Sequence, residues 1–415
     1  MLALRQSTSR ALTKTVSASR SCVQIRHFTS YTAESAGLYL KKLRTTFPYA
    51  WLRDSCQAPT SIHPSTLQKL HRSSDIPVNI QPAQDGIQIT PEALHIRWED
   101  GHESTFTPEF LRRHSSSSNL QKFHGDVSSE LWDAASIRKT DNLFVAYDSL
   151  KEPQGQLDAI VQLLRYGLVF VTGVPTGETS DETCELRALA AAFGRIRYTF
   201  YGHVWNVRNI KESRNIAYTN LDLGLHMDLL YHQHPPQYQI LHCLRNRVKG
   251  GSSIFVDSFK AADDLRLRFP SAYDLLSSTL VPFHYINDGH HMHCERPTFE
   301  LTQVSQQLKH VNYSPPFQAP LLLDTPAGFY EAMKRFADIL GEGENRYEYL
   351  LREGDAVLFD NRRVLHSRTA FEDIEGEGKE GDTNRWLKGC YLDDDTILDN
   401  LKMRGLRKVV QEDGA

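Results

Sequence analysis

The chain has 415 residues, of which 40% are hydrophobic and 24% are charged, as in an ordinary globular protein. Its 47 basic and 51 acidic residues leave a net charge of −4, which argues against a nucleic-acid-binding protein built on a strongly basic domain. The longest apolar run, Leu168–Val174, is far shorter than a transmembrane helix needs, so we expect no membrane span. The 6 scattered cysteines do not resemble a disulfide scaffold and favour a reducing compartment.

The first thirty residues differ in composition from the rest of the chain. Met1–Ser30 contains five Lys or Arg residues and ten Ser or Thr residues, and the first acidic residue is Glu34. A basic, Ser-rich, acid-poor segment without a continuous apolar core is typical of a mitochondrial transit peptide. We therefore expect residues 1–30 to direct the chain to the mitochondrial matrix; the alternative is a basic tail without a targeting role.

A small N-terminal domain is expected over residues 35–120. Within it, Val78–Phe110 alternates apolar and polar residues and contains Asp-Gly pairs, which predicts a small antiparallel β unit. The serine run Ser115–Ser118 is expected to be a linker or an exposed loop. The larger domain is expected over residues 140–400.

The larger domain shows one helical segment early, several strands and a second helix. Gln156–Gly167 has helical spacing, and Met333, Phe336 and Leu340 predict a helix that stops near Gly341. Strands are predicted at residues 168–175, 238–243, 253–257 and 356–361. Residues 290–295 (HHMHCE) and 372–382 are expected to be exposed loops, and we assign no metal to the first. Many strands and few helices predict a mainly β fold with flanking helices, such as a barrel or jelly roll.

A His-x-Asp pair and a distant histidine form the candidate metal site. His226 and Asp228 are two residues apart, so in a strand their side chains would share one face. His366 follows much later, in the segment DNRRVLHSR. Two imidazoles and one carboxylate leave room on a ferrous ion for a co-substrate and O₂, as in the non-heme Fe(II) oxygenases. By itself the pair is a weak signal, because the chain has 18 histidines.

The segments around these residues make the signal specific. In order along the chain they read WLRDSC, HMD, YHQHPPQYQILHCL, GGSSIFVDSF, FDNRRVLHSR and RWLKGCYLDD. This order resembles the γ-butyrobetaine dioxygenase and trimethyllysine dioxygenase family, which is taurine-dioxygenase-like, from about Trp51 to about Asp395. The resemblance implies a double-stranded β-helix (jelly-roll) catalytic domain behind a small, β-rich N-terminal domain. It also implies an Fe(II)- and 2-oxoglutarate-dependent dioxygenase that uses O₂, with ascorbate keeping the iron reduced.

The resemblance assigns the metal and co-substrate residues. It implies that His226, Asp228 and His366 are the catalytic iron ligands. Arg385 matches the arginine that holds the far carboxylate of 2-oxoglutarate, a task that suits the two-pronged guanidinium group. Arg363 and Arg368 lie nearer to His366 in the sequence and remain rivals for that role.

Two further residues complete the co-substrate site by the same resemblance. Ser253 matches a hydroxyl near the co-substrate, although a serine after Gly-Gly is also a common turn residue. Leu241 is implied to line the same pocket.

Four aromatic residues match the family's binding site for a quaternary ammonium group. Such a group cannot donate a hydrogen bond, and aromatic faces attract it within about 6 Å. The resemblance implies a cage of Tyr201, Trp205, Tyr218 and Tyr391; the alternative is an ordinary aromatic core. Tyr201 and Trp205 are four residues apart and would share a face of a strand or a helix. By strand spacing, Tyr391 would share a face with Arg385.

The other end of the substrate is matched less completely. Asn215 matches a family asparagine that binds the substrate carboxylate. A second family asparagine has no direct counterpart here, so either Asn312 or Ser314 takes its role or the binding of the substrate is altered. Related proteins are often dimers, so a homodimer stays open.

A zinc site of animal relatives is expected to be absent. Its Cys-x-Cys-x-x-Cys cluster reads Cys56, Ala58 and Ser61 here, and His102 is the later histidine. Two remaining ligands cannot form a closed tetrahedral site, so we predict no structural zinc.

The resemblance implies hydroxylation of γ-butyrobetaine to L-carnitine, a step of carnitine biosynthesis. The nearest alternative is trimethyllysine hydroxylation, whose substrate has an extra amine that calls for an acidic partner. A non-catalytic jelly-roll binding protein and a zinc hydrolase are remoter alternatives. The presence of His226, Asp228, His366 and Arg385 together argues against the first, and a hydrolase would have no use for Arg385 together with the aromatic residues.

Overall fold

The computed structural model describes residues 30–124, 127–208, 219–303, 306–373 and 384–413. It divides into two compact units, Met1–His124 and Gly125–Ala415, which are described separately here. The predicted transit segment therefore lies, apart from Ser30, outside the described residues. None of the helices in the described part of the chain is long and apolar enough to cross a bilayer.

The first unit contains two small antiparallel sheets. Their strands run in the orders β1-β2-β3 and β4-β5-β6. The bounds are β1 Tyr31–Ala33, β2 Gly37–Leu40, β3 Thr45–Pro48, β4 Pro82–Ile89, β5 Leu94–Trp98 and β6 Glu103–Phe106. Three short helices accompany them: α1 Tyr49–Asp54, α2 Pro108–Arg113 and α3 Ser117–His124. The predicted antiparallel β unit is thus confirmed, with Leu38, Trp98 and Phe106 in its core.

Two local features of this unit differ from what the sequence pattern alone suggests. The Asp85-Gly86 pair is not a hairpin turn but a bulge inside β4, where Asp85 has a φ of 53° and the register shifts. The turn is made instead by Asp100 and Gly101, between β5 and β6. The serine run is only partly a loop, because Ser117 and Ser118 begin α3.

The second unit is built on two sheets with antiparallel pairing throughout, except at one edge. The larger sheet runs β10-β23-β12-β20-β8-β7, with β9 also paired to β23 and β7 parallel to β8. Its bounds are β7 Phe144–Ala146, β8 Leu168–Thr172, β9 Ile196–Arg197, β10 Trp205–Arg208, β12 Tyr238–Asn246, β20 Ala356–Asp360 and β23 Arg385–Leu392. The smaller sheet runs β11-β21-β14-β19. Its bounds are β11 Leu223–His226, β14 Ser253–Asp257, β19 Tyr347–Tyr349 and β21 Val364–Arg368. This is the predicted jelly roll.

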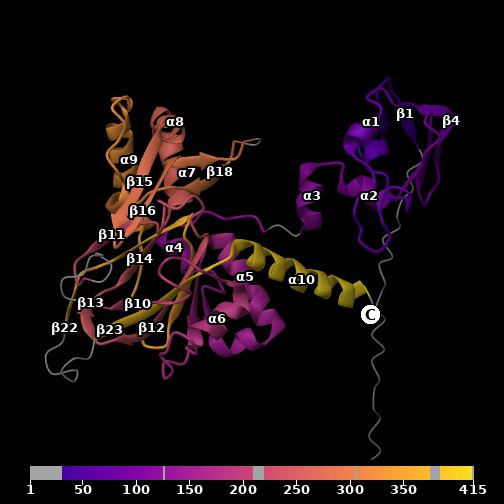
Figure 1. Ribbon diagram of the computed structural model, residues 1–415. Helices are drawn as coiled ribbons and strands as arrows, with labels where there is room; N and C mark the ends of the chain where they lie inside the picture. The colour runs from indigo at the N-terminus through magenta and orange to yellow at the C-terminus, as the bar shows by residue number, and fades with distance from the viewer. Residues whose placement is uncertain (1–29, 125–126, 209–218, 304–305, 374–383, 414–415) are drawn as a thin grey trace, which may run out of the picture. The chain divides into compact units, whose positions relative to one another are not determined.

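Helices cover the larger sheet and one end of the unit (Figure 1). Helix α5, Pro153–Tyr166, packs on β8 and β20, and α6, Glu185–Phe193, packs on β23. The remaining helices are α4 Ala134–Ile137, α7 Ser258–Arg268, α8 Pro270–Ser278, α9 Phe329–Gly341 and α10 Asp394–Asp413. Helices α7, α8 and α9 pack on one another. The predicted helix before Gly341 is confirmed; its buried stripe is Ala332, Phe336, Ile339 and Leu340.

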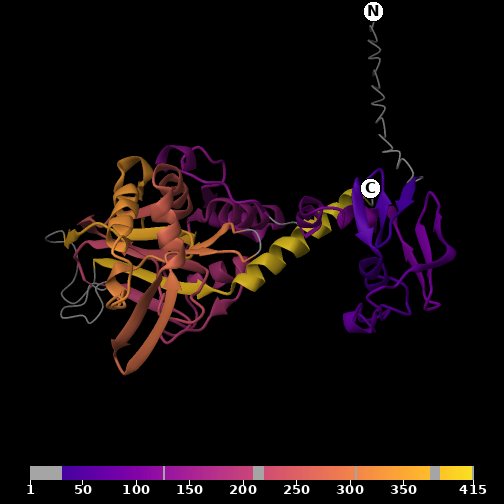
Figure 2. The same cartoon turned by 90° about the horizontal axis from the view of Figure 1, so that it is seen from above.

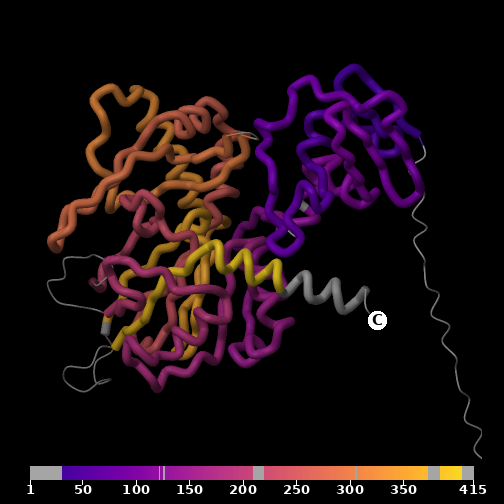
Figure 3. Tube along the Cα trace, turned by 45° about the vertical axis from the view of Figure 1, so that its right-hand side comes forward, coloured from indigo at the N-terminus to yellow at the C-terminus, as the bar shows by residue number. Residues whose placement is uncertain are grey.

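Three two-stranded ribbons complete the unit. They are β13 Val248–Gly250 with β22 Phe371–Asp373, β15 Leu280–Asn287 with β16 His290–Pro297, and β17 Phe299–Leu301 with β18 Leu308–Val311. The β15–β16 hairpin projects as a long arm (Figures 2 and 3). Residues 290–295 are therefore strand and not loop, because each pairs across the hairpin, as His293 does with His284. Glu372 likewise pairs in β22, while residues 374–383 lie outside the description.

Candidate active site

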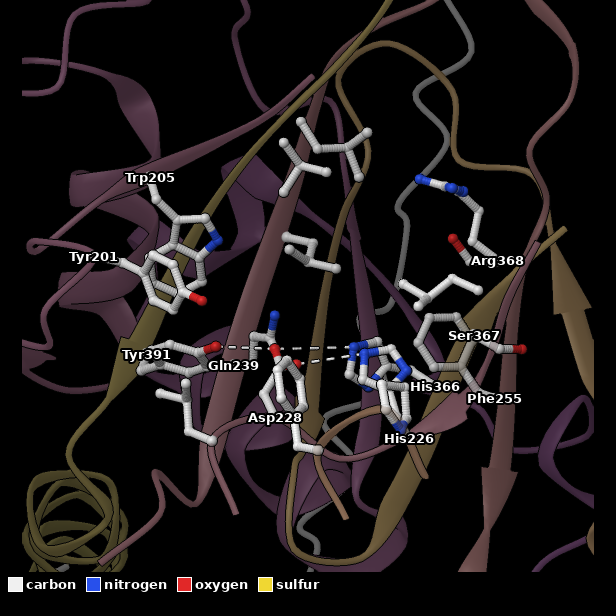
Figure 4. A pocket seen from close by; sticks show the side chains of 18 of the residues that line it. Tyr201, Trp205, His226, Asp228, Gln239, Phe255, His366, Ser367, Arg368 and Tyr391 are labelled. Carbon is white, nitrogen blue, oxygen red and sulfur yellow. Dashed lines mark hydrogen bonds and ion pairs between the residues drawn. The ribbon is translucent and has the colours of Figure 1, made fainter. Parts of the chain in front are cut away.

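The three predicted metal ligands come together between strands of the smaller sheet. His226 is the last residue of β11, and its Cα partner in β21 is His366. The two rings lie 4.2 Å apart between centroids. Asp228 has one carboxylate oxygen 3.4 Å from Nε2 of His226 and the other 4.0 Å from Nε2 of His366. Figure 4 shows the three side chains converging at the pocket.

A turn, and not a strand, presents Asp228. β11 ends at His226, and Leu229 takes a left-handed φ of 61°. The turn is held by the buried amide of Asn361, whose Oδ1 accepts from the backbone N–H of Asp228 at 2.8 Å and whose Nδ2 donates to the carbonyl of Asp228 at 3.0 Å. The strand argument for the His-x-Asp pair was therefore wrong in its detail, although the two side chains do meet.

The protonation of the three groups suits a divalent metal. Burial and the neighbouring His226 together lower the pKa of His366 to about 3, so its imidazole is neutral and has a free lone pair. Burial opposes the ionisation of Asp228, but hydrogen bonds from His226 and Tyr391 and the neighbouring His366 lower its pKa below the usual range. Nδ1 of His226 lies 2.9 Å from the carbonyl of Gly224, which leaves Nε2 for a metal.

The donor set fits ferrous iron. The candidate ligand atoms all lie within 4.8 Å of one another, and ligands at right angles on an ion, each about 2.1 Å away, would lie about 3 Å apart. Two imidazoles and one carboxylate are the set that leaves several positions open on Fe(II). His226, Asp228 and His366 are thus the residues that would hold the iron.

The pocket at the metal ligands is lined by both sheets. Its lining residues are Tyr201, Trp205, Val207, Leu223, His226, Asp228, Leu229, Tyr231, Gln239, Leu241, Ser253, Phe255, Pro316, Phe317, His366, Ser367, Arg368, Arg385, Leu387 and Tyr391. It therefore brings together the three predicted metal ligands, the predicted co-substrate residues Arg385, Ser253 and Leu241, and the cage residues Tyr201, Trp205 and Tyr391. Asn215 and Tyr218 lie outside the described residues.

One part of the pocket carries buried positive charge. Arg385 is the first residue of β23 and Ser253 the first of β14; both are buried, and Leu241 of β12 lies in the same lining. Burial and the neighbouring Arg368 lower the pKa of Arg385 to about 10, so a carboxylate bound there would be stabilised by the guanidinium group. Ser253 is paired in a strand and is not a turn residue. These residues suit the far carboxylate of 2-oxoglutarate.

The rival arginines differ in their surroundings. Arg363 does not line the pocket, because its guanidinium forms a buried ion pair with Asp257 at 2.8 Å. Arg368 does line the pocket, but its Nη2 donates to the backbone carbonyls of Thr219 and Leu221. Arg385 is thus the better placed of the three to receive the co-substrate.

Three aromatic rings form one side of the pocket, which we call the aromatic wall: Tyr201, Trp205 and Tyr391 (Figure 4). The ring centroids of Trp205 and Tyr391 lie 4.3 Å apart, and those of Tyr201 and Trp205 lie 6.2 Å apart. The first distance is too short for a methylated amine to enter between the rings. A cation would therefore lie against their shared outer face. The hydroxyl of Tyr391 donates to Asp228 at 2.9 Å, which ties the wall to the metal site.

Regular spacing explains only part of this wall. Arg385 and Tyr391 both face the pocket from β23, as their separation in a strand predicts. Tyr201 belongs to neither a strand nor a helix; it lies in a tight turn, where Gly202 has a φ of 95° and pairs with Thr199. Tyr201 and Trp205 do line the same pocket, but a turn, and not the predicted strand or helix, brings Tyr201 there.

The sequence arguments missed several lining residues. Gln239 is 3% exposed, and its Oε1 has no hydrogen-bond partner among the described residues. It lies two residues before Leu241 on β12, so strand alternation from Leu241 would have found it. Tyr231 and Phe317 also line the pocket, 5.1 Å apart between centroids, and have no comparable local signal.

The two candidates for the second substrate asparagine lie outside the pocket lining. Asn312 donates to the carbonyl of Pro297 at 2.7 Å and accepts from Arg362 at 2.7 Å, so its amide serves the fold. Ser314 is 2% exposed, and its hydroxyl oxygen has no partner in the described part of the chain.

The remnant of the zinc site lies in the first unit. Nε2 of His102 lies 3.2 Å from the buried Sγ of Cys56 and 3.4 Å from Oγ of Ser61. The nearby His63 is engaged locally, with Nδ1 accepting from the backbone of Ser65 and Thr66. Cys56 and His102 thus keep their proximity as a thiol–imidazole contact.

Comparison with known proteins gives the family. Residues 138–391 match the taurine catabolism dioxygenase TauD, TfdA family, and residues 39–112 match the gamma-butyrobetaine hydroxylase-like N-terminal domain. Dioxygenase str8 of Strobilurus tenacellus is 52% identical over 91% of this chain and 90% of its own length. Gamma-butyrobetaine dioxygenase of Pseudomonas sp. (strain AK-1) is 30% identical over 86% of this chain and 89% of its own. Mitochondrial trimethyllysine dioxygenase of Bos taurus is 28% identical over 95% of this chain and 90% of its own length.

These matches cover both units, and the larger of them contains all three metal ligands together with Arg385 and Tyr391. The chain therefore belongs to the TauD, TfdA family, in its gamma-butyrobetaine hydroxylase-like group, and is an Fe(II)- and 2-oxoglutarate-dependent dioxygenase.

Proposed function

We propose that the chain hydroxylates γ-butyrobetaine to L-carnitine. The observation that carries this proposal is a single pocket that has the three metal ligands beside an aromatic wall and buried guanidinium groups in the same lining. Iron and 2-oxoglutarate, when bound, supply the oxidising chemistry that inserts one atom of O₂ into a C–H bond, with succinate and CO₂ as the other products. Ascorbate serves to keep the iron reduced.

The protein's contribution is orientation. The faces of Trp205 and Tyr391 attract the trimethylammonium group, at about 0.5–2 kcal/mol for each ring in contact. Arg385 and Ser253 bind the co-substrate at the other side of the metal ligands. With substrate and co-substrate both held, one C–H bond of the substrate would be kept next to the iron site. This fixed orientation is the main way in which the protein's own residues can accelerate the reaction. We assign the substrate carboxylate to Asn215, and Tyr218 to the cage, by family resemblance.

The charge of the pocket favours γ-butyrobetaine over trimethyllysine. Trimethyllysine carries an additional α-ammonium group, which needs an acidic partner when it is buried. Among the described lining residues, Asp228 is the one carboxylate, and it is committed to the metal. Trimethyllysine hydroxylation is therefore the second candidate, supported by the likeness to trimethyllysine dioxygenases.

The test is mass spectrometry of the products after incubation with Fe(II), 2-oxoglutarate, ascorbate and each candidate in turn. We expect a gain of one oxygen in γ-butyrobetaine together with an equal amount of succinate. A chain that oxidises trimethyllysine or another amine in preference, or that leaves γ-butyrobetaine unchanged, would refute the proposal. The His226→Ala variant serves as the control, because it loses a metal ligand.

We also propose a mitochondrial location, supported by the acid-free, basic composition of residues 1–30. A fluorescent protein fused to residues 1–35 is expected to enter mitochondria. A diffuse signal in the cytosol would contradict the proposal.

A further inference from the structure

One position of β23 that faces the pocket has no side chain. Arg385, Leu387 and Tyr391 alternate along this strand and all line the pocket. Gly389 lies between Leu387 and Tyr391 on the same face. Its Cα partner on the edge strand β10 is Trp205.

The indole of Trp205 occupies the space that a side chain at 389 would take. A Cβ atom built on Gly389 would lie 2.6 Å from Cε2 and 2.7 Å from both Cζ2 and Nε1 of Trp205. Real Cβ atoms essentially never approach other heavy atoms to less than 3.0 Å. The three atoms belong to one rigid ring system, so they cannot give way separately.

Backbone conformation does not explain this glycine. Its φ lies outside the left-handed range, so an L-residue could adopt the same backbone. Glycine within a strand is otherwise unfavourable, and it marks a place where another group approaches the backbone closely. Here the approaching group is the indole of Trp205.

A short series of contacts connects the indole packed on Gly389 to the metal site. In this position the indole packs against the ring of Tyr391, with 4.3 Å between ring centroids and 31° between ring planes. The hydroxyl of Tyr391 then donates to the metal ligand Asp228. On the other side Trp205 packs toward Tyr201 and is 9% exposed, so a displaced indole has little room except in the pocket.

We propose that Gly389 is a specificity-determining positioning residue, which seats Trp205 on β23 and so sets the place of the quaternary ammonium group relative to the metal. The ligand part of this inference rests on the proposed function. A methyl group at 389 moves the indole off the strand and disturbs the aromatic wall. It leaves the co-substrate residues Arg385 and Ser253 in place.

The first measurement follows Trp205 itself, without any ligand. Protein labelled with 5-fluorotryptophan gives one ¹⁹F signal for each of its 5 tryptophans, and the Trp205→Leu variant identifies the signal of Trp205. We expect Gly389→Ala to shift that signal most. The matched control is Gly177→Ala, whose new Cβ meets nothing within 4 Å and whose φ is not left-handed; it should leave the signal in place.

The second measurement is calorimetric binding to the Zn(II)-substituted protein in the absence of O₂. We expect Gly389→Ala to raise the Kd of γ-butyrobetaine about tenfold, the equivalent of losing one ring contact. The Kd of 2-oxoglutarate should stay within about twofold, because Arg385, the proposed partner of its far carboxylate, lies at the start of β23, four residues before Gly389. In the Trp205→Leu background, Gly389→Ala should have no further effect on either ligand.

Distinct results overturn the inference and the proposed function. An unmoved Trp205 signal, or an equal loss of γ-butyrobetaine affinity with and without Trp205, would overturn the role of Gly389. Failure of the unaltered protein to bind γ-butyrobetaine would overturn the proposed function, while the ¹⁹F signal would still decide whether Gly389 seats the indole. If Gly389→Ala alone does not fold, the double variant with Trp205→Leu should fold, and its failure would also overturn the inference.

Discussion

Replacing Arg363 should damage the fold and spare the co-substrate site. Arg363 is 2% exposed, and its guanidinium donates to both carboxylate oxygens of Asp257, at 3.0 and 2.8 Å. It also donates to the backbone carbonyls of Glu130 and Arg165. One side chain thus joins four segments of the second unit: the chain before α4, the end of α5, the start of α7 and the turn before β21.

The size of the effect follows from what Arg363→Leu leaves behind. Asp257 would keep two backbone donors, the N–H groups of Trp132 and Phe259, both at 3.1 Å, but its buried charge would lose its counter-ion. Removing one partner of a buried ion pair costs about 3–5 kcal/mol. At roughly 2–4 °C per kcal/mol, the thermal midpoint should fall by about 6–20 °C. The Asp257→Leu/Arg363→Leu double variant should recover part of this loss, because no unpaired charge remains.

The assay combines unfolding with co-substrate binding. Urea and thermal unfolding give the stability, and anaerobic fluorescence titration gives the Kd of 2-oxoglutarate for the folded protein. We expect Arg363→Leu to leave that Kd within about twofold, whereas Arg385→Leu should raise it about 30-fold or more through loss of a charged hydrogen-bond partner. The reasoning is refuted if Arg363→Leu is as stable as the unaltered protein, or if it loses the co-substrate as Arg385→Leu does.

Three further outcomes test other parts of the structure. Tyr391→Phe keeps its ring but loses the bond to Asp228, so Fe(II) affinity should fall about 10–100-fold while the Kd of γ-butyrobetaine stays within about twofold; equal iron affinity would contradict this. Burial lowers the pKa of His242 to about 4, so the free energy of unfolding should fall as the pH drops from about 6.5 to 4. At pH 5 this loss is about 2 kcal/mol, and His242→Gln should remove it. Thermal midpoints of both proteins at pH 7 and pH 5 measure the difference. Elemental analysis should find no structural zinc at Cys56 and His102, and one zinc per chain besides iron would show this to be wrong.

The sequence predicted most where the backbone is regular. Alternation in β23 correctly put Arg385 and Tyr391 on one face, and the same rule applied to β12 finds Gln239 beside Leu241. The apolar runs also marked the central strands, such as β20, because both faces of those strands are buried. Regular strands convert sequence spacing directly into geometry.

The sequence predicted least where turns and distant side chains set the geometry. Tyr201 reaches the pocket through a turn, and Asp228 is held by the amide of Asn361, which is far from it in sequence. Residues Asp85 and Gly86 look like a hairpin turn, but they form a bulge because the register of β4 with β5 shifts there. Such features depend on which segments meet, and local patterns carry no information on that.

The two sheets divide the work of the site between them. The smaller sheet supplies both histidines, and His366 packs against Phe359 of the larger sheet at 4.7 Å between centroids. The larger sheet supplies Arg385 and Tyr391. The bond from Tyr391 to Asp228 therefore links the aromatic wall to the metal ligands across the interior of the unit. Because one strand, β23, carries both Arg385 and Tyr391, a change in its backbone would move the proposed co-substrate site and one ring of the aromatic wall together. Trp205 lies on the edge strand β10 instead, so a substitution there would alter the surface offered to the substrate while the bond from Tyr391 to Asp228 keeps both its partners.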